Sequence, residues 1–116
     1  MTKALIENLY KAVDDRNVEK LSEYLSDNVR FRIANFDVVH GKPDVLAANK
    51  SFFESISSMS HTFETILSKG DTVVCDGVVN YVRKDGSPHS AHFATILKLQ
   101  NGLIEDYFVY ADISDL

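Results

Sequence analysis

Apolar residues recur at helical spacing in three parts of the first half of the chain. Residues 2–15 place Leu5, Ile6, Leu9, Tyr10 and Val13 on one helical face. Asn17 is a suitable N-cap for a second helix, which ends near residues 26–28 and carries Val18, Leu21, Tyr24 and Leu25. Pro43 suits the first turn of a third helix, whose apolar face holds Val45, Leu46, Phe52, Phe53 and Ile56.

Alternation of apolar and polar residues predicts strands in the rest of the chain. Residues 29–33 alternate and place Arg30 and Arg32 on one face. Residues 57–60 break the pattern, and residues 61–68 predict another strand. Three long strands follow within residues 71–112, with turns at residues 84–88 and at Asn101-Gly102. The pattern therefore predicts an α+β fold of three helices interspersed with one strand, followed by four antiparallel strands.

Both faces of the predicted sheet are apolar. In the first long strand, Val73, Cys75, Val79 and Tyr81 alternate with Val74, Val78 and Val82. An antiparallel sheet in a monomer usually leaves one face in water, and three helices cover only one face. We therefore expect a homodimer that forms through the sheet. The alternative is high strand propensity without any interface.

Composition and charge narrow the class of protein. The 116 residues suit one domain, residues 1–116, and the net charge of −5 disfavours nucleic acid and anionic membranes as partners. Cys75 is the only cysteine, so no intrachain disulfide is expected and a reducing compartment fits. The first 15 residues do not have the pattern of a signal peptide or of a membrane span. We expect a cytoplasmic protein.

Four segments carry a resemblance to a known family: RNVEKLSEYLSDNVRF, GKPDVLAANKSFF, GDTVVCDGVV and HFATILKLQNGLIEDYFVYAD. Together with the order of the elements, they resemble the SnoaL-like branch of the nuclear transport factor 2-like superfamily. The resemblance implies a cystatin-like α+β cone, in which three N-terminal helices pack in the concave face of a strongly bent, mainly antiparallel sheet. Gly77, inside a predicted strand, permits such a bend or a bulge. The resemblance also implies a mostly apolar pocket inside the cone.

Enzymes of this superfamily include ketosteroid isomerases, epoxide hydrolases, dehydratases and polyketide cyclases. The resemblance implies an acid at position 95 in the isomerases and at position 109 in the epoxide hydrolases, where this chain has Thr95 and Val109. Neither activity is therefore expected. The remaining catalytic candidates are Asp112, Asp76 and His61.

Each of these candidates has a structural alternative. Asp112 resembles the terminal aspartate of the family, but a solvated residue at a strand end would look the same. Asp76 either lines the cavity or pairs across strands at an interface, because an unpaired polar group there would be costly. His61 shares the predicted face of Phe63 and Leu67. A core or rim histidine is the alternative to a base.

Aromatic residues provide the main evidence for a pocket. The predicted ligand-binding residues are Tyr10, Phe31, Asn49, Phe53, Phe93, Thr95, Tyr107 and Val109. An apolar cavity with a few polar groups is the usual form of a small-molecule site. The histidines and acids lack metal-ligand spacing and no cofactor-binding motif is present, so neither a metal nor a cofactor is expected.

These features predict a small-molecule-binding protein that holds an apolar or polycyclic compound. Proton transfer of the isomerase, cyclase or hydrolase kind is the expected chemistry. The alternative is a non-catalytic binding or dimerisation module of the same fold.

Overall fold

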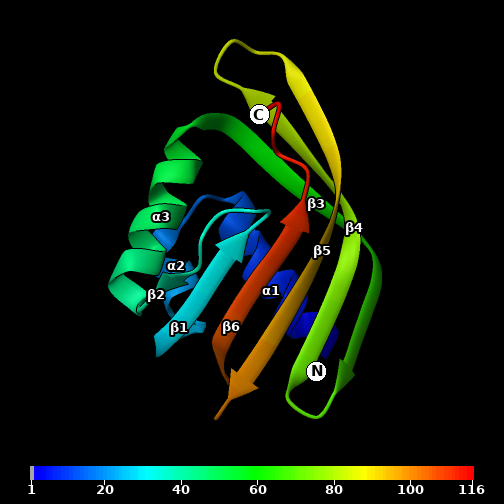
Figure 1. Cartoon of the computed structure of the whole chain (residues 1–116). Helices are drawn as coiled ribbons and strands as arrows, with labels where there is room; N and C mark the ends of the chain where they lie inside the picture. The colour runs from blue at the N-terminus through cyan, green and yellow to red at the C-terminus, as the bar shows by residue number, and fades with distance from the viewer. Residues whose placement is uncertain (1) are drawn as a thin grey trace.

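The structure is a computed structural model that describes residues 2–116 (Figure 1). Its elements are α1 (Thr2–Asp14), α2 (Val18–Ser22), β1 (Leu25–Ile33), β2 (Val39–His40), α3 (Lys42–Glu54), β3 (Ile56–Lys69), β4 (Thr72–Arg83), β5 (Pro88–Gln100) and β6 (Leu103–Ala111). Within the described residues, every helix is too short or too polar to cross a membrane.

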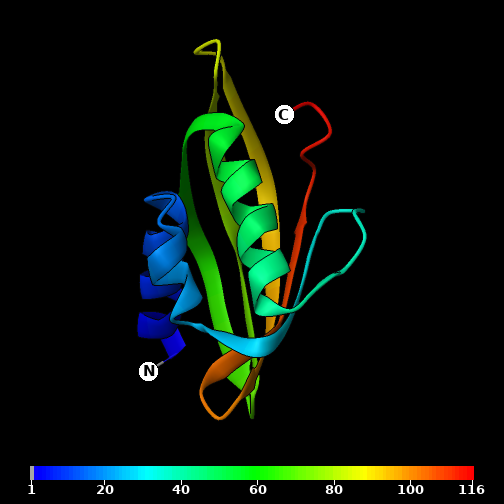
Figure 2. The ribbon, with the colours of Figure 1, turned by 90° about the vertical axis from the view of Figure 1, so that its left-hand side faces the viewer.

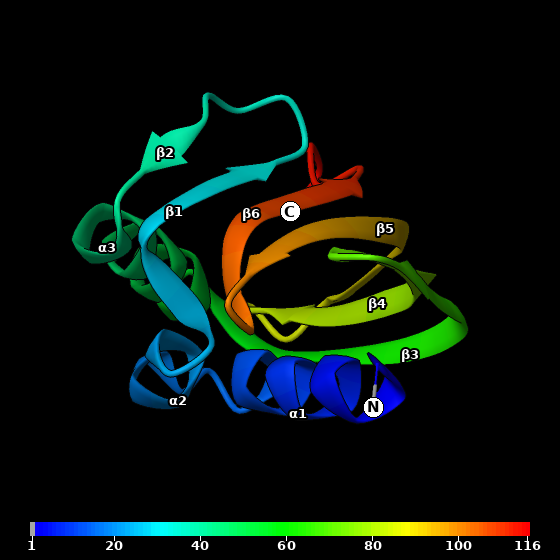
Figure 3. The same cartoon turned by 90° about the horizontal axis from the view of Figure 1, so that it is seen from below.

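The strands form one six-stranded sheet in the order β2-β1-β6-β5-β4-β3. All neighbouring pairs are antiparallel except β1 and β6, which are parallel. Helix α1 packs along β3 and α3 packs beside β1, as the view from below shows (Figure 3). Figure 2 shows the same arrangement from the side, with α1 and the β1–β2 loop on opposite sides of the long strands. The predicted α+β class and mainly antiparallel sheet are confirmed.

Two predicted boundaries are wrong for identifiable reasons. The second helix ends at Ser22, and Leu25 already pairs with Ile104 in the sheet. The apolar side chain of Leu25 fits a buried strand position as well as a helix stripe. Strand β3 begins at Ile56, since Ser58, Met59 and Ser60 pair with β4 although the two serine side chains are polar. The predicted cap is confirmed, because the Lys20 backbone N–H donates to Asn17 Oδ1 at 3.0 Å.

The hydrophobic core lies between the helices and the inner face of the sheet. Helix α1 contributes Ile6, Leu9 and Val13, all fully or almost fully buried. On β4, the alternate residues Val73, Cys75, Val79 and Tyr81 are buried on the same side. Their neighbours Val74, Asp76 and Val78 point to the outer face and are half-buried. A side chain of β4 that acts inside the protein must therefore lie on the same face as Cys75 and Tyr81.

Gly77 allows β3 and β4 to approach closely. It pairs with Phe63, and a Cβ atom at Gly77 would lie only 1.9 Å from the Thr62 carbonyl oxygen. The register of β3 shifts between Phe63 and Thr65, which is a β-bulge. The bulge moves later residues to the opposite face, so Leu67 pairs with Val74 and is 63% exposed. The expectation that Leu67 shares the face of His61 is therefore wrong.

Candidate functional site

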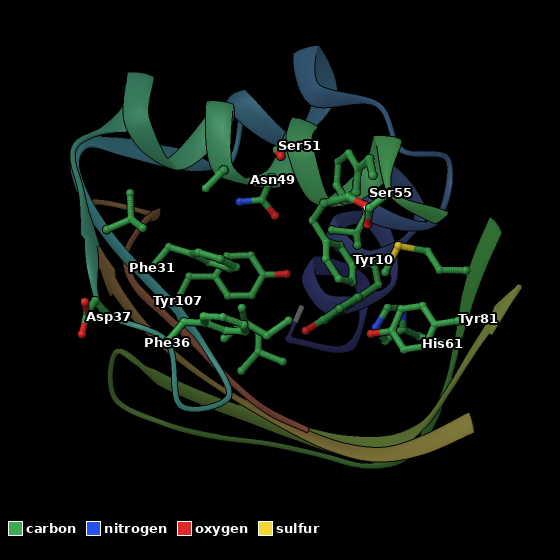
Figure 4. A pocket seen from close by; sticks show the side chains of 18 residues that line it. Tyr10, Phe31, Phe36, Asp37, Asn49, Ser51, Ser55, His61, Tyr81 and Tyr107 are labelled. Carbon is green, nitrogen blue, oxygen red and sulfur yellow. The ribbon is translucent and has the colours of Figure 1, made fainter. Parts of the chain in front are cut away.

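A cavity of about 490 Å³ lies between α1, α3 and the inner face of the sheet (Figure 4). Its size falls within the range of about 300–1,000 Å³ that is usual for small-molecule sites. Its wall is mainly aromatic and includes Tyr10, Phe31, Phe36, Phe52, Tyr81 and Tyr107. Phe36, from the loop between β1 and β2, is 63% exposed and lies at the mouth. The cavity therefore presents a mostly apolar surface to a ligand.

Six of the eight predicted ligand-binding residues line this cavity: Tyr10, Phe31, Asn49, Phe53, Tyr107 and Val109. The other two, Phe93 and Thr95, are buried behind Tyr10 and do not line it. The Phe93 ring centroid is 5.8 Å from that of Tyr10, and Thr95 Oγ1 is 2.5 Å from the Tyr10 hydroxyl. Phe93 and Thr95 therefore support the wall from behind.

The tyrosine hydroxyls are the main polar groups of the wall. Burial raises the pKa of Tyr10 well above its ordinary value, and burial likewise raises the pKa of Tyr107. Burial raises the pKa of Tyr81 to about 12. These hydroxyls are therefore protonated near neutral pH and available as hydrogen-bond donors. Figure 4 shows the Tyr107 hydroxyl directed toward the middle of the cavity.

Asn49 contributes an amide to the same wall from α3. Its side chain is 6% exposed, and Nδ2 donates to the Val45 carbonyl at 2.9 Å within the helix. Its Oδ1 has no hydrogen-bond partner among residues 2–116 and faces the cavity (Figure 4). The amide oxygen is therefore placed to accept a hydrogen bond from a ligand.

His61 and Asp14 form a hydrogen-bonded pair at the inner end of the cavity. His61 Nδ1 lies 2.6 Å from Asp14 Oδ1, and the His61 backbone N–H donates to Asp14 Oδ2 at 2.9 Å. The His61 side chain is 5% exposed and that of Asp14 is 24% exposed. The ring packs between Tyr10 and Phe93, at centroid distances of 4.4 and 4.9 Å. A carboxylate on Nδ1 fixes the proton there, which leaves Nε2 as a proton acceptor.

Asp14 is a site residue that the sequence reasoning missed. It lies at the end of α1, one helical turn after Tyr10, so both residues share a helical face. Its partner is 47 residues away on β3. The sequence contains one signal for Asp14, which is that an acidic residue continues the apolar stripe of the first helix.

The other two catalytic candidates lie outside the cavity. Asp112 follows β6 and is hydrogen-bonded to Ser114, whose backbone N–H and hydroxyl donate at 3.1 and 2.6 Å. These bonds lower the pKa of Asp112, so it remains an exposed carboxylate. Asp76 lies on the outer face of β4, opposite Ala94. Asp76 therefore belongs to the outer surface of the sheet and is not placed to act as a base in the cavity.

Charged groups are scarce around the cavity. Among the described residues that line it, the acidic and basic side chains are Asp37 at the mouth and His61 inside. No lysine or arginine of residues 2–116 lines it. No three His, Cys, Asp or Glu side chains of that range are grouped so that they could hold a metal ion. The geometry suits an uncharged ligand better than a carboxylate or phosphate ester.

Comparisons with known proteins agree on the fold. The family model described as "SnoaL-like domain" matches residues 6–107. A nuclear transport factor 2-like protein of unknown function from Burkholderia pseudomallei has a TM-score of 0.87 at 16% identity, over 98% of this chain and 92% of that one. A comparison with curated protein sequences found no match.

Two further solved structures are similar. A hypothetical protein with a ketosteroid isomerase-like fold from Catenulispora acidiphila, in complex with trimethylamine, has a TM-score of 0.88 at 17% identity, over 98% of this chain and 89% of that chain. An LEH-like epoxide hydrolase of M. tuberculosis has a TM-score of 0.81 at 13% identity, over 95% of this chain and 81% of that chain. At these identities the likeness concerns the fold alone.

Proposed function

The chain belongs to the SnoaL-like domain family, and on that premise we propose that it is a proton-transfer enzyme acting on an uncharged, largely apolar small molecule. His61 is the general base and acid, and Asp14 is its positioning residue. The observation that carries the proposal is the 2.6 Å contact between His61 Nδ1 and Asp14 Oδ1 beside an aromatic cavity. A histidine whose second nitrogen is bound by a carboxylate is the usual arrangement of a general base.

The reaction begins with a carbon acid, such as the C–H next to a ketone. His61 Nε2 takes the proton, the C–H electron pair becomes a carbon–carbon double bond, and the carbonyl electrons move to the oxygen to form an enolate. In this proposal the protonated hydroxyl of Tyr107, a residue of the cavity wall, donates a hydrogen bond to that oxygen. In a β,γ-unsaturated ketone, return of the proton to the γ-carbon gives the conjugated isomer. In a β-hydroxy ketone, the hydroxyl instead leaves and takes the proton from the His61 imidazolium, which releases water and an α,β-unsaturated ketone.

The apolar walls assist this step. The charge that develops on the enolate and on the imidazolium is shielded from water, which strengthens its interaction with Asp14 and with the tyrosine hydroxyls. The absence of a cationic side chain among the described wall residues favours a neutral ketone or lactone over an acid substrate.

An epoxide hydrolase activity, as described for one relative of the same fold, fits the residues of this cavity less well. The similar M. tuberculosis protein is described as an epoxide hydrolase. In this chain, Val109 lines the cavity at the position where the resemblance implies an acid for such hydrolases. A carbon-acid reaction at His61 therefore fits these residues better than attack of water on an epoxide.

The test is hydrogen exchange in a panel of neutral cyclic ketones, beginning with 2-tetralone, in deuterated water. The wild-type protein should accelerate deuterium incorporation next to the carbonyl, as followed by NMR. His61→Asn should lower the accelerated rate by about 100-fold or more. His92→Asn is the matched control, because His92 is exposed on the outer face of β5, and it should exchange at the wild-type rate.

Two results would contradict the proposal. If His61→Asn retained the wild-type rate, His61 would not be the base. If the ketones bound to the wild-type protein without any accelerated exchange, the site would be a binding site only, and the non-catalytic alternative would be favoured.

A further inference from the structure

Phe36 is more exposed than every other described aromatic side chain of the cavity wall. It lies in the loop between β1 and β2 and is 63% exposed, whereas Tyr10, Phe31 and Tyr107 of the same wall are buried. Removal of an aromatic side chain from water is favourable. Phe36 therefore gains from any movement that covers its ring with an apolar surface.

The loop fixes the main chain firmly on one side of Phe36 only. Ala34 has a φ of 53°, a left-handed conformation that turns the chain away from β1. The Phe36 backbone N–H then donates to the Ile33 carbonyl at 3.1 Å. Residues 37 and 38 make no backbone hydrogen bond within residues 2–116 before β2 begins. The ring of Phe36 is therefore carried at the end of a turn.

The Phe36 ring lies between two open spaces. On one side is the cavity, across which Figure 4 shows Asn49 and Ser51 of α3. On the other side is a second hollow of about 800 Å³, which lies between the β1–β2 loop and residues 110–114. Exposed side chains change rotamer within nanoseconds. The ring can therefore turn toward α3 or toward residues 110–114 without displacing the main chain.

The rim of the mouth opposite Phe36 consists of short side chains. Ala48, Ser51 and Ser55 of α3 line the cavity, and both serines are exposed. These side chains do not extend far from the helix. Closure of the mouth therefore depends on the side of the loop, where Phe36 is the largest apolar residue of the wall.

From this placement we propose that Phe36 is a gate that selects ligands by whether the cavity encloses them completely. Its ring turns toward α3 and closes over an apolar compound that fits inside the cavity of about 490 Å³. The ring stays turned outward when part of the compound projects through the mouth. Closure removes the ring from water and adds its contact to the enclosed ligand alone. This gate rests on the proposed function only in that the cavity is the ligand site, and it does not require proton transfer at His61.

A tryptophan at the gate tests the movement. The chain has no tryptophan, so Phe36→Trp introduces a single fluorophore at this position. The ligand is 2-decalone, a neutral two-ring ketone without an aromatic ring, and calorimetry establishes the concentration that saturates the site. Saturation should shift the emission of the variant to shorter wavelengths and lower its quenching by iodide severalfold. Leu67→Trp is the control, because Leu67 is also 63% exposed but does not line the cavity, and its quenching should not change.

An affinity comparison tests the selection. Phe36→Ala should weaken the binding of 2-decalone by about 10-fold or more, mainly through faster dissociation. The second ligand is the same ketone with a methoxy-poly(ethylene glycol) chain on its far ring, which must remain in water and hold the mouth open. This ligand should bind to the wild type and to Phe36→Ala with the same affinity. Leu67→Ala is the control and should bind both ligands as the wild type does.

Three results would overturn the gate. The first is equal iodide quenching of Phe36→Trp with and without bound 2-decalone. The second is an unchanged affinity of Phe36→Ala for 2-decalone. The third is an equal loss of affinity for both ligands, which would show that Phe36 is a fixed part of the wall.

The same measurements separate the gate from the proposed reaction. Addition of His61→Asn to Phe36→Trp should leave the ligand-dependent shielding intact, since closure needs only an occupied cavity. Shielding without accelerated deuterium exchange in the wild type would support the gate and contradict the reaction. Failure of every ketone in the panel to bind to the wild type in calorimetry would overturn both.

Discussion

Asp14 binds His61 at two points, through the imidazole ring and through the main chain. Oδ1 lies 2.6 Å from the ring Nδ1, and Oδ2 accepts the His61 backbone N–H at 2.9 Å. One carboxylate therefore fixes both the position of β3 relative to α1 and the orientation of the ring.

Asp14→Asn should separate these two roles. An amide retains one acceptor oxygen, so the fold should persist with a loss of about 1–2 kcal/mol in the free energy of unfolding. The ring, however, loses the carboxylate that accepts its Nδ1 hydrogen bond and fixes its orientation. The rate of deuterium exchange in 2-tetralone should fall by about 100-fold or more, with little change in KM.

Asp15→Asn is the matched control for this prediction. Asp15 is the next residue, is exposed and pairs only with Lys11 at 3.0 Å among the described residues. It should leave both exchange and stability near the wild-type values. Equal losses in the two variants would show that Asp14 acts through the general charge of the helix end.

Thr95→Val should destabilise the protein without removing any group from the cavity wall. The Thr95 hydroxyl is fully buried and bonds to the Tyr10 hydroxyl. Valine keeps the volume but leaves Tyr10 without this partner, at a cost of about 1–3 kcal/mol in urea unfolding. Thr95→Ser keeps the hydroxyl and should cost only about the 1 kcal/mol of one buried methyl group. If serine were as harmful as valine, packing and not the hydrogen bond would explain the position.

Asn49→Leu should change ligand preference more than stability. The Asn49 amide oxygen faces the cavity without a partner in residues 2–116, so its replacement by an apolar group leaves no buried donor unsatisfied. The free energy of unfolding should change by less than about 1 kcal/mol. In calorimetric titrations, ligands that donate a hydrogen bond should lose affinity relative to hydrocarbons of the same shape. Equal losses for both kinds of ligand would mean that Asn49 acts only through its volume.

Stability should fall at alkaline pH because of the buried tyrosines. The pKa values of Tyr10 and Tyr107 in the folded protein lie above the ordinary value of 10.0. Above pH 10 the unfolded chain releases these protons and the folded chain keeps them, so the free energy of unfolding decreases as pH rises. Each tyrosine contributes a slope of up to about 1.4 kcal/mol per pH unit, and below pH 10 the contribution is constant.

Urea unfolding between pH 8 and pH 11.5 measures this slope. The double variant Tyr10→Phe and Tyr107→Phe should show a shallower decrease than the wild type. Tyr24→Phe, at a half-buried position outside the cavity, is the control. An unchanged slope in the double variant would assign the alkaline loss to other groups.

Much of the fold could be predicted because alternation and helical spacing are local signals. They located α1, α3 and the hairpins of β4, β5 and β6. The predicted start of β1 was wrong because Leu25 suits both the apolar stripe of a helix and a buried position in a strand. The site was harder, since Asp14 and His61 meet only when α1 docks on β3, and no local pattern reports that contact. The prediction of the face that Leu67 occupies was wrong because a β-bulge reverses the alternation of faces within β3.

The bulge opposite Gly77 also has a consequence for how this sequence can change over time. Phe63, the partner of Gly77, is two residues after His61 on the same strand. Any side chain at position 77 would push the Thr62 carbonyl outward and displace His61 from Asp14. Drift at a position that touches no ligand would then disable the site, so the tolerance of Gly77 to substitution should match that of a catalytic residue.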